Sequence, residues 1–451
     1  MSINTYQSPL SERYASPEMG RIFSAQHKYS TWRRLWLALA QAEKELGLPI
    51  TNEQLAELSA HLDDIDFDKV AQYEKVMQHD VMAHIHAYGA LCPKARPIIH
   101  WGATSCYVTD NADLIQMREG LALLLDKLKR LNKIIGQFAS KHARLACLAY
   151  THFQPAQLTT LGKRACLWLQ DFREDAKELQ LRLDNMPFLG VKGATGTQAS
   201  FLALFHGEQD KVSQLDYLVA EKMGFSHLLT ITGQTYPRKW DSILLNALAG
   251  IGVSASKCAT DLRLLAHLKE VLEPFGTQQV GSSAMPYKRN PILAERVCGL
   301  SRFIISLAQN GAYTAATQWL ERTLDDSVNR RLTLPEAFLT CDAILDLLIK
   351  IFDGLAVNEK AIAAHVEEEL PLISLENILM AAVEKGGDRQ SLHESLRQYS
   401  LKHEKQNLLD AVAQDPAFNL KADEIGQLLS VDKLVGRAPE QVEEFLKEGL
   451  I

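Results

Sequence analysis

The feature that most constrains the fold is a long apolar seam in the first half of the chain. Between residues 114 and 138, apolar side chains recur at alternating steps of three and four: Leu114, Met117, Leu121, Leu124, Leu128, Leu131, Ile135 and Phe138. This spacing predicts one long helix with a single apolar stripe. A second seam of the same kind runs from Leu244 to Leu265, and Lys269 breaks it. Because such helices cannot bury their stripes alone, the sequence predicts an all-α bundle and an oligomer.

Other parts of the chain carry helical periodicity as well. It covers residues of about 25–47, 156–186, 292–320 and 336–355, whereas alternating strand patterns are scarce. We therefore expect little or no β-sheet.

Two interruptions of the helical pattern suggest domain boundaries. Residues that cap helices well stand at 109–111, and Gly354 and Asn358 interrupt a later helix. Beyond them, Gly386 and Pro416 are expected to separate shorter helices. We expect three helical domains: an N-terminal domain at 1–104, a central long-helix bundle at 105–357 and a C-terminal domain at 358–451.

Composition excludes several classes of protein. The 451 residues are 47% hydrophobic, which excludes a disordered chain, and the formal net charge is −7 without a long block of like charge. We therefore expect no binding to nucleic acid or to a membrane surface. The sequence shows no secretory signal and no apolar run of membrane-spanning length. The seven cysteines are scattered without a CxxC pair, which indicates reduced thiols in a cytoplasmic protein.

The segment 281–291 carries the densest chemistry of the chain. It reads Gly-Ser-Ser-Ala-Met-Pro-Tyr-Lys-Arg-Asn-Pro between two helical patterns. Loops that only connect helices are usually short runs of turn-forming residues. Here Ser282 and Ser283 offer hydroxyls as proton acceptors, Lys288 can neutralise an anion and Asn290 can orient one. The sequence therefore predicts a functional loop within residues 276–291.

His152 stands before a helix that we expect to begin near Pro155. A histidine just before a helix N-terminus can face a cleft, and its pKa near neutrality suits proton transfer. On residue types alone, however, a core or capping histidine is the more common case. Both interpretations of His152 stay open at this level of analysis.

A second histidine cluster covers residues 79–86. His79 and His86 share a helix face, and His84 lies on a different one. A metal site of the HExxH kind needs histidines four residues apart with a carboxylate, and that pattern is absent, so no metal is expected. Asp80 and His84 are expected to form an ordinary pair on the exposed side of the helix.

Several of these segments together resemble the adenylosuccinate lyase family of the fumarase/aspartase superfamily. The loop fits the superfamily signature Gly-Ser-Ser-x-Met-Pro-x-Lys-x-Asn-Pro, and the likeness extends from about residue 6 to about residue 439, closest to the longer, animal-type branch. The other matching segments are Ser8–Ser16, His79–Asp80, Gly102–Ser105, Thr151–His152 and Glu321–Arg331.

The resemblance implies a C–N lyase (amidine-lyase) of purine biosynthesis that uses neither metal nor organic cofactor. Members cleave adenylosuccinate to AMP, and the succinocarboxamide ribotide to the carboxamide ribotide, by β-elimination of fumarate. The fold implied is three all-helical domains, with four subunits pooling their central domains into one long bundle. Each active site of such a homotetramer takes residues from three subunits.

The resemblance also implies roles for individual residues. Ser282 would be the general base, His152 the general acid, Lys288 the cation beside the aci-carboxylate, and His79 a second histidine that orients the substrate. Residues expected at the phosphate and ribose are Arg13, Tyr14, Arg322, Ser327 and Arg331. Residues expected at the succinyl carboxylates and nearby groups are Thr104, Ser105, Gln234 and Arg296. Further residues expected to bind substrate are Gln78, Asp80, Thr151 and Asn290.

Without the family context, these residues have plainer interpretations. Arg322 and Arg331 fit solvated helix positions, Thr104 and Ser105 a cap or turn. Gln78 stands where the family usually has arginine, and a neutral amide hydrogen-bonds an anion less strongly than a guanidinium does. Two rival functions also remain: another lyase of the superfamily, such as argininosuccinate lyase, aspartase or fumarase, and a structural protein such as a lens crystallin derived from a lyase.

Overall fold

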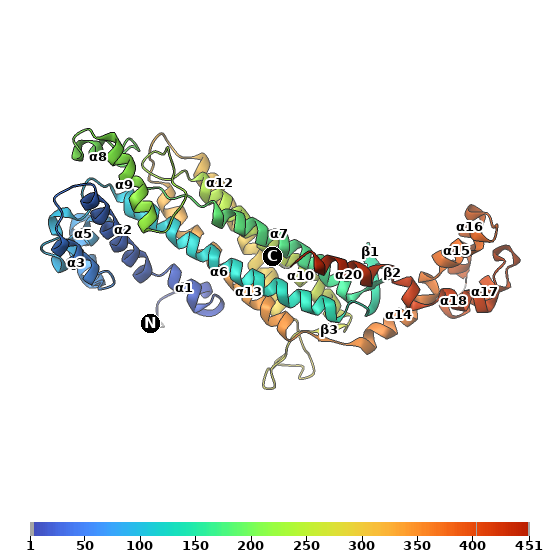
Figure 1. The fold of residues 1–451 in the computed structure, drawn as a ribbon. Helices are drawn as coiled ribbons and strands as arrows, with labels where there is room; N and C mark the ends of the chain where they lie inside the picture. Colours follow the sequence, from blue (N-terminus) through green and yellow to red (C-terminus); the bar gives the residue numbers. More distant parts are fainter. Residues whose placement is uncertain (1–3, 403, 450–451) are drawn as a thin grey trace. The chain divides into compact units, whose positions relative to one another are not determined.

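The computed structural model describes residues 4–402 and 404–449 of the chain (Figure 1). Its residues group into two compact units. The first unit comprises residues 1–127, 175–253 and 299–346, and the second comprises 128–174, 254–298 and 347–451. This grouping does not test the division at 104 and 357, so the three-domain organisation stays a prediction.

Long helices have residues in both units: α6 (Ser105–Lys141), α7 (Leu161–Asp184), α10 (Lys239–His267), α11 (Ile292–Leu307) and α13 (Asp326–Asp353). The first unit also holds η1 (Leu10–Tyr14), α1 (Pro17–Ile22), α2 (Ala25–Glu45), α3 (Asn52–Ala60), α4 (Phe67–Met77), α5 (Asp80–Leu91), η2 (Arg96–Ile98), α8 (Ala199–Leu204), α9 (Gln209–Lys222) and α12 (Gln309–Ala316).

The second unit holds the described strands and the C-terminal helices. The strands are β1 (Ala146–Thr151), β2 (Gln154–Thr160), β3 (Val271–Leu272) and β4 (Ala356–Val357). The helices are α14 (Glu359–Ile373), α15 (Leu375–Glu384), α16 (Arg389–Lys402), α17 (Lys405–Gln414), η3 (Pro416–Phe418), α18 (Ala422–Leu428), α19 (Val431–Leu434) and α20 (Ala438–Lys447).

Both apolar seams are buried, and the all-α fold class is confirmed. Every seam residue of α6 is at most 8% exposed, and every seam residue of α10 is at most 4% exposed. In the first unit, α6 and α13 approach closely at Gly120, where a Cβ would lie 2.7 Å from the Phe338 ring. α10 is also long and apolar enough to cross a membrane, but half of its most apolar stretch is buried inside the protein, as in a core helix.

The segment around His152 differs from the prediction. β1 and β2 pair in an antiparallel hairpin, and α7 begins at Leu161 instead of near Pro155. His152 and Phe153 turn the hairpin with φ values of 51° and 59°. Two successive left-handed residues match the twist of a two-residue hairpin turn and cannot start a right-handed helix. Leu148 and Leu158 pack on Val366 of α14, so tertiary packing stabilises the strands.

Other helix boundaries also shifted. The helix expected over 292–320 is divided into α11 and α12, and α13 begins at Asp326, well before the expected 336. The capping residues at 109–111 lie inside α6, which begins at Ser105. Asn111 donates to the Gly190 carbonyl and Asp110 binds Arg238, so these two side chains bind other segments instead of capping the helix.

Candidate active site

A cavity of about 910 Å³ opens in the first unit. Three helices begin at its wall, because Asp80 is the first residue of α5, Ser105 of α6 and Asp326 of α13, and the lining includes Asp80, Ser105 and Ser327. The first turn of a helix carries unsatisfied N–H groups and a partial positive charge. The cavity is therefore suited to an anionic ligand.

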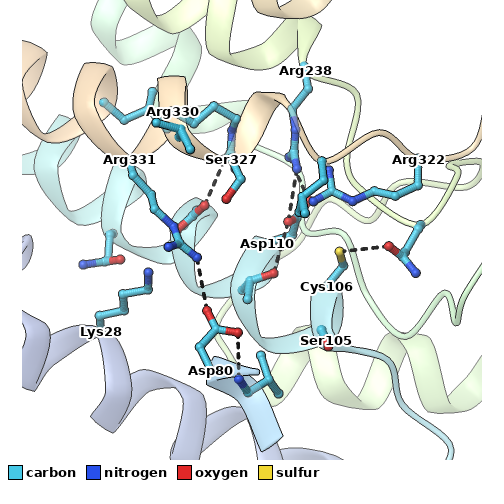
Figure 2. A pocket seen from close by; sticks show the side chains of 18 of the residues that line it. Lys28, Asp80, Ser105, Cys106, Asp110, Arg238, Arg322, Ser327, Arg330 and Arg331 are labelled. Carbon is cyan, nitrogen blue, oxygen red and sulfur yellow. Dashed lines mark hydrogen bonds and ion pairs between the residues drawn. The ribbon is translucent and has the colours of Figure 1, made fainter. Parts of the chain in front are cut away.

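The cavity brings together many of the residues that the sequence predicted at the substrate. Those on its lining are Gln78, His79, Asp80, Thr104, Ser105, Gln234, Arg322, Ser327 and Arg331 (Figure 2). They come from three separate segments: residues 78–105, the connection before α10, and residues 322–331, which cover the end of the turn before α13 and the start of that helix.

The junction between α4 and α5 presents His79 to the cavity. Gln78 ends α4 in the left-handed conformation, with φ 52°. His79 then caps α5, since its Nδ1 accepts a hydrogen bond from the Met82 N–H at 3.3 Å. The accepting Nδ1 carries no proton in this arrangement, so Nε2 is the protonated nitrogen, 3.5 Å from the Ser105 hydroxyl. His79 is thereby oriented as a donor toward the cavity.

The expectation that Asp80 and His84 pair on the exposed side is wrong. Asp80 forms an ion pair with Arg331 instead, at 3.1 Å. His84 is buried, and its ring stacks on Tyr29 with centroids 3.8 Å apart. Burial lowers the pKa of His84 to about 4, so the ring is neutral at neutral pH.

Arg322 is held in place by Asp326, which the sequence analysis did not single out. The Asp326 carboxylate is fully buried and accepts from Arg322 at 2.8 Å and from Arg238 at 2.6 Å. Burial alone would raise the pKa of this carboxyl, but Arg238 and Arg322 outweigh it, and the net pKa is lowered. The ion pair fixes the Arg322 guanidinium at the cavity wall.

A second buried arginine lies beside this pair. Arg330 donates to Asp241 at 2.7 Å and to Asp113 at 2.9 Å, and Arg238 also binds Asp110 at 2.8 Å. Removing one partner from such a network leaves an uncompensated buried charge, which is costly. The network therefore holds Arg238 and Arg330 rigidly on the cavity lining; Figure 2 shows Arg238 with Asp110.

Gln234 is positioned by its backbone and by a thiol. Its N–H donates to the Glu321 carbonyl at 3.0 Å, and a Cβ on Gly233 would lie 2.5 Å from the same oxygen, so only glycine permits this approach. The Cys106 thiol donates to Gln234 Oε1 at 3.4 Å. Burial raises the pKa of Cys106 to about 12, so the thiol keeps its proton. The amide nitrogen of Gln234 consequently points to Thr104, 3.4 Å from its hydroxyl.

Other predicted residues lie elsewhere. Arg13 and Tyr14 belong to η1 of the first unit, where the Arg13 guanidinium lies 5.9 Å from the Tyr14 ring centroid, and neither lines the cavity. In the second unit, Thr151 ends β1, His152 follows in the hairpin turn, and Arg296 lies on α11.

The signature loop of the second unit has a defined internal structure. The Ser282 hydroxyl oxygen accepts from the N–H groups of Met285 at 3.1 Å and of Ala284 at 3.3 Å. The Asn290 amide donates to the Gly281 carbonyl at 3.0 Å, so Asn290 ties the two ends of the loop together. Lys288 is exposed.

Glu273 anchors the loop to α11, and the sequence analysis did not single it out. Its carboxylate accepts from the N–H groups of Leu293 at 2.9 Å and Ala294 at 2.7 Å, in the first turn of α11. The carboxylate thereby satisfies two of the free N–H groups at the start of that helix.

Comparison with known proteins agrees with this architecture. A family model described as lyase matches residues 15–305, and a model of the adenylosuccinate lyase C-terminus matches residues 371–445. Adenylosuccinate lyase of Saccharomyces cerevisiae is 48% identical over 99% of this chain and 95% of its own length. The enzyme of Pyrococcus abyssi is 33% identical over 97% of each chain.

Solved structures with low identity share the fold. A fumarate lyase from Mesorhizobium is 22% identical with a TM-score of 0.83, covering 99% of this chain and 100% of its own. The 3-carboxy-cis,cis-muconate lactonizing enzyme of Pseudomonas putida is 23% identical with a TM-score of 0.85, covering 97% and 98%. The fold and the close relatives agree: the chain belongs to the adenylosuccinate lyases of the fumarase/aspartase superfamily.

Proposed function

We propose that the chain cleaves the C–N bond of adenylosuccinate by β-elimination, giving fumarate and AMP. It acts in the same way on the succinocarboxamide ribotide of purine biosynthesis, giving aminoimidazole carboxamide ribotide and fumarate. The observation that carries this proposal is the cavity, where three helix N-termini and the guanidinium groups of Arg322 and Arg331 face one space. Each substrate bears a phosphate and two carboxylates, and helix N-termini and guanidinium groups are groups that bind such anions.

The elimination requires a base for the C–H beside a carboxylate, and Ser282 fills this role. A serine hydroxyl is a weak base in water, so its alkoxide must be stabilised. The N–H groups of Ala284 and Met285 already point at the Ser282 oxygen. Hydrogen bonds to the charged form of a group favour that form. Lys288 supplies the cation that stabilises the aci-carboxylate formed after proton removal.

The departing nitrogen needs an acid, and His152 supplies the proton. His152 and Phe153 are exposed and both left-handed, in a turn type that usually contains glycine or asparagine. Each such residue costs about 1–3 kcal/mol, and strain of this kind clusters at functional sites. The strained turn therefore supports a functional role for His152 beyond a plain connection.

The two ends of the substrate bind different groups. Arg322, Ser327 and Arg331, together with Arg13 and Tyr14, take the phosphate and ribose. At the succinyl end, the binding groups are Thr104, Ser105, Gln234 and Arg296, with Thr151 and Asn290 nearby. His79 donates from Nε2 to the substrate, and Gln78 and Asp80 shape the wall beside it.

The active enzyme is a cytoplasmic homotetramer whose sites each take residues from three subunits. The segment that leads into α13 supports an assembly, because large apolar side chains there are exposed. The most exposed is Leu320 at 98%, followed by Trp319 and Leu324. Partner subunits would cover this surface. The enzyme uses no metal or organic cofactor, and it binds neither nucleic acid nor membrane.

The test is a substrate panel for the purified protein. Adenylosuccinate, the succinocarboxamide ribotide, argininosuccinate, aspartate and malate are incubated in turn, and fumarate is measured in each reaction. We expect fumarate from the first two only, with AMP in equal amount from the first. Fumarate from argininosuccinate, aspartate or malate instead would assign the chain to another lyase activity, and no turnover at all would favour a structural role.

A further inference from the structure

The arginines on the cavity lining are all committed to carboxylates. Each donates to at least one aspartate within the first unit: Arg238, Arg322, Arg330 and Arg331. A bound polyanion must therefore compete with these aspartates for every guanidinium. An uncommitted cation in the same cavity would bind the anion without that competition.

Lys28 is such a cation. It lies in the first turns of α2 and is half-buried on the cavity lining. Its ammonium lies over the rings of Tyr29 and Trp32, at 5.8 Å and 5.6 Å from their centroids. Among the residues that the structure describes, no carboxylate oxygen lies within the 4.0 Å ion-pair distance of this ammonium. The aromatic rings position the ammonium without neutralising it.

Lys28 stands beside the Arg331–Asp80 pair. The Tyr29 ring stacks on His84 at 3.8 Å, and the charges of Lys28 and Asp80 both act on the pKa of His84. Asp80 and Arg331 in turn both act on the pKa of Tyr29. Figure 2 shows the Lys28 side chain extending toward the pair. The Lys28 ammonium, the Arg331–Asp80 pair and the Glu74 carboxylate thus all act on the stacked rings of Tyr29 and His84.

We propose that Lys28 is a substrate-binding residue that grips the phosphate together with Arg331. A phosphate carries about 1.5 to 2 negative charges at neutral pH. The Arg331–Asp80 pair carries no net charge, so Lys28 adds the uncompensated positive charge that the phosphate needs beside this pair. Lysine suits this role as a mobile point charge, and Arg331 supplies the planar fork. The identity of the phosphate-bearing substrate rests on the proposed function, but the anion site itself does not.

The experiment compares Lys28→Met, which keeps length and removes charge, with Lys28→Arg, which restores charge. Lys75→Met is the matched control, because Lys75 is exposed near the end of α4 and does not line the cavity. Each protein is assayed on adenylosuccinate and on its dephosphorylated form. We expect Lys28→Met to lower kcat/KM for adenylosuccinate about tenfold or more, mainly through KM, as for a lost charge-assisted contact. On the dephosphorylated form it should stay within about twofold of wild type.

Calorimetry with inorganic phosphate and with AMP measures the affinity of the anion site without turnover. Both should bind more weakly to Lys28→Met than to wild type or Lys75→Met, and Lys28→Arg should recover part of the loss. If wild type fails to cleave adenylosuccinate but binds phosphate through Lys28, the proposed function fails and the anion site stands. Equal losses on both substrates, or unchanged phosphate binding in Lys28→Met, would overturn the assignment.

Discussion

Replacing Arg331 by alanine should raise KM for adenylosuccinate by about tenfold or more, because a charge-assisted hydrogen bond contributes about 1.5–3 kcal/mol and 1.4 kcal/mol is tenfold. In the ligand-free structure this guanidinium binds Asp80 at 3.1 Å, and its side chain is 60% exposed. An exposed ion pair contributes only about 0.2–1 kcal/mol. A phosphate therefore displaces Asp80 from Arg331 at little cost in free energy. Most of the free energy of the phosphate–Arg331 contact then contributes to substrate binding, and its loss raises KM.

The assay measures KM and kcat for Arg331→Ala and Arg331→Lys on adenylosuccinate and on its dephosphorylated form. Arg331→Lys should recover only part of the loss, because lysine lacks the planar fork that binds phosphate through two N–H groups. The dephosphorylated form should discriminate poorly between wild type and Arg331→Ala.

Asp80→Asn tests whether Asp80 competes with the phosphate for Arg331. It releases Arg331 from its partner and should leave KM for adenylosuccinate unchanged or lower. Equal losses for Arg331→Ala on both substrates would refute the placement of the phosphate. They would mean that Arg331 supports the fold or the succinyl end. Kinetic constants unchanged within about twofold would mean that it is a solvated helix residue.

Further predictions concern catalysis, stability and pH. Ser282→Ala and His152→Ala should each lower kcat by at least about 10²-fold, which is the usual scale for a positioned proton transfer. Neither substitution should change assembly. If Ser283→Ala is the inactive variant instead of Ser282→Ala, the base is the neighbouring serine. Asp326→Ala should destabilise the protein by about 3–5 kcal/mol, because it leaves buried guanidinium charge unpaired, and thermal unfolding at fixed protein concentration measures this. His84 has a pKa lowered from 6.5 to about 4, so the unfolded chain binds its proton first as pH falls. Folding stability should therefore decrease as pH falls from about 6.5 to about 4, and His84→Phe should flatten that decrease.

The sequence alone was sufficient for the features that repeat locally. The seams of α6 and α10 follow helical geometry, so their burial could be read from spacing. The loop at residues 281–291 could be identified from the sequence because the types and the order of its residues match a specific signature. Gln78 and His79 were placed at the substrate by the resemblance alone, and they do line the cavity.

The missed features depend on contacts between distant residues. Asp110 fits a helix cap when read locally, but it binds Arg238, 128 residues away. Asp326 and Arg330 escaped notice for the same reason, since no local pattern marks a buried ion pair. The β1–β2 hairpin was missed because the segment after His152 lacks strand alternation, and α14 provides the packing that stabilises it.

The central proposal is an active site shared between subunits, in which His152 and Ser282 come from different chains. Mixing two inactive variants tests it most directly. His152→Ala and Ser282→Ala are combined in equal amounts, subunits are exchanged, and fumarate release from adenylosuccinate is measured. In randomly mixed tetramers, about a quarter of the sites would carry neither lesion, so activity should return to about a quarter of the wild-type value. No recovery in demonstrated mixed tetramers, or a monomer by sedimentation, would contradict the shared site.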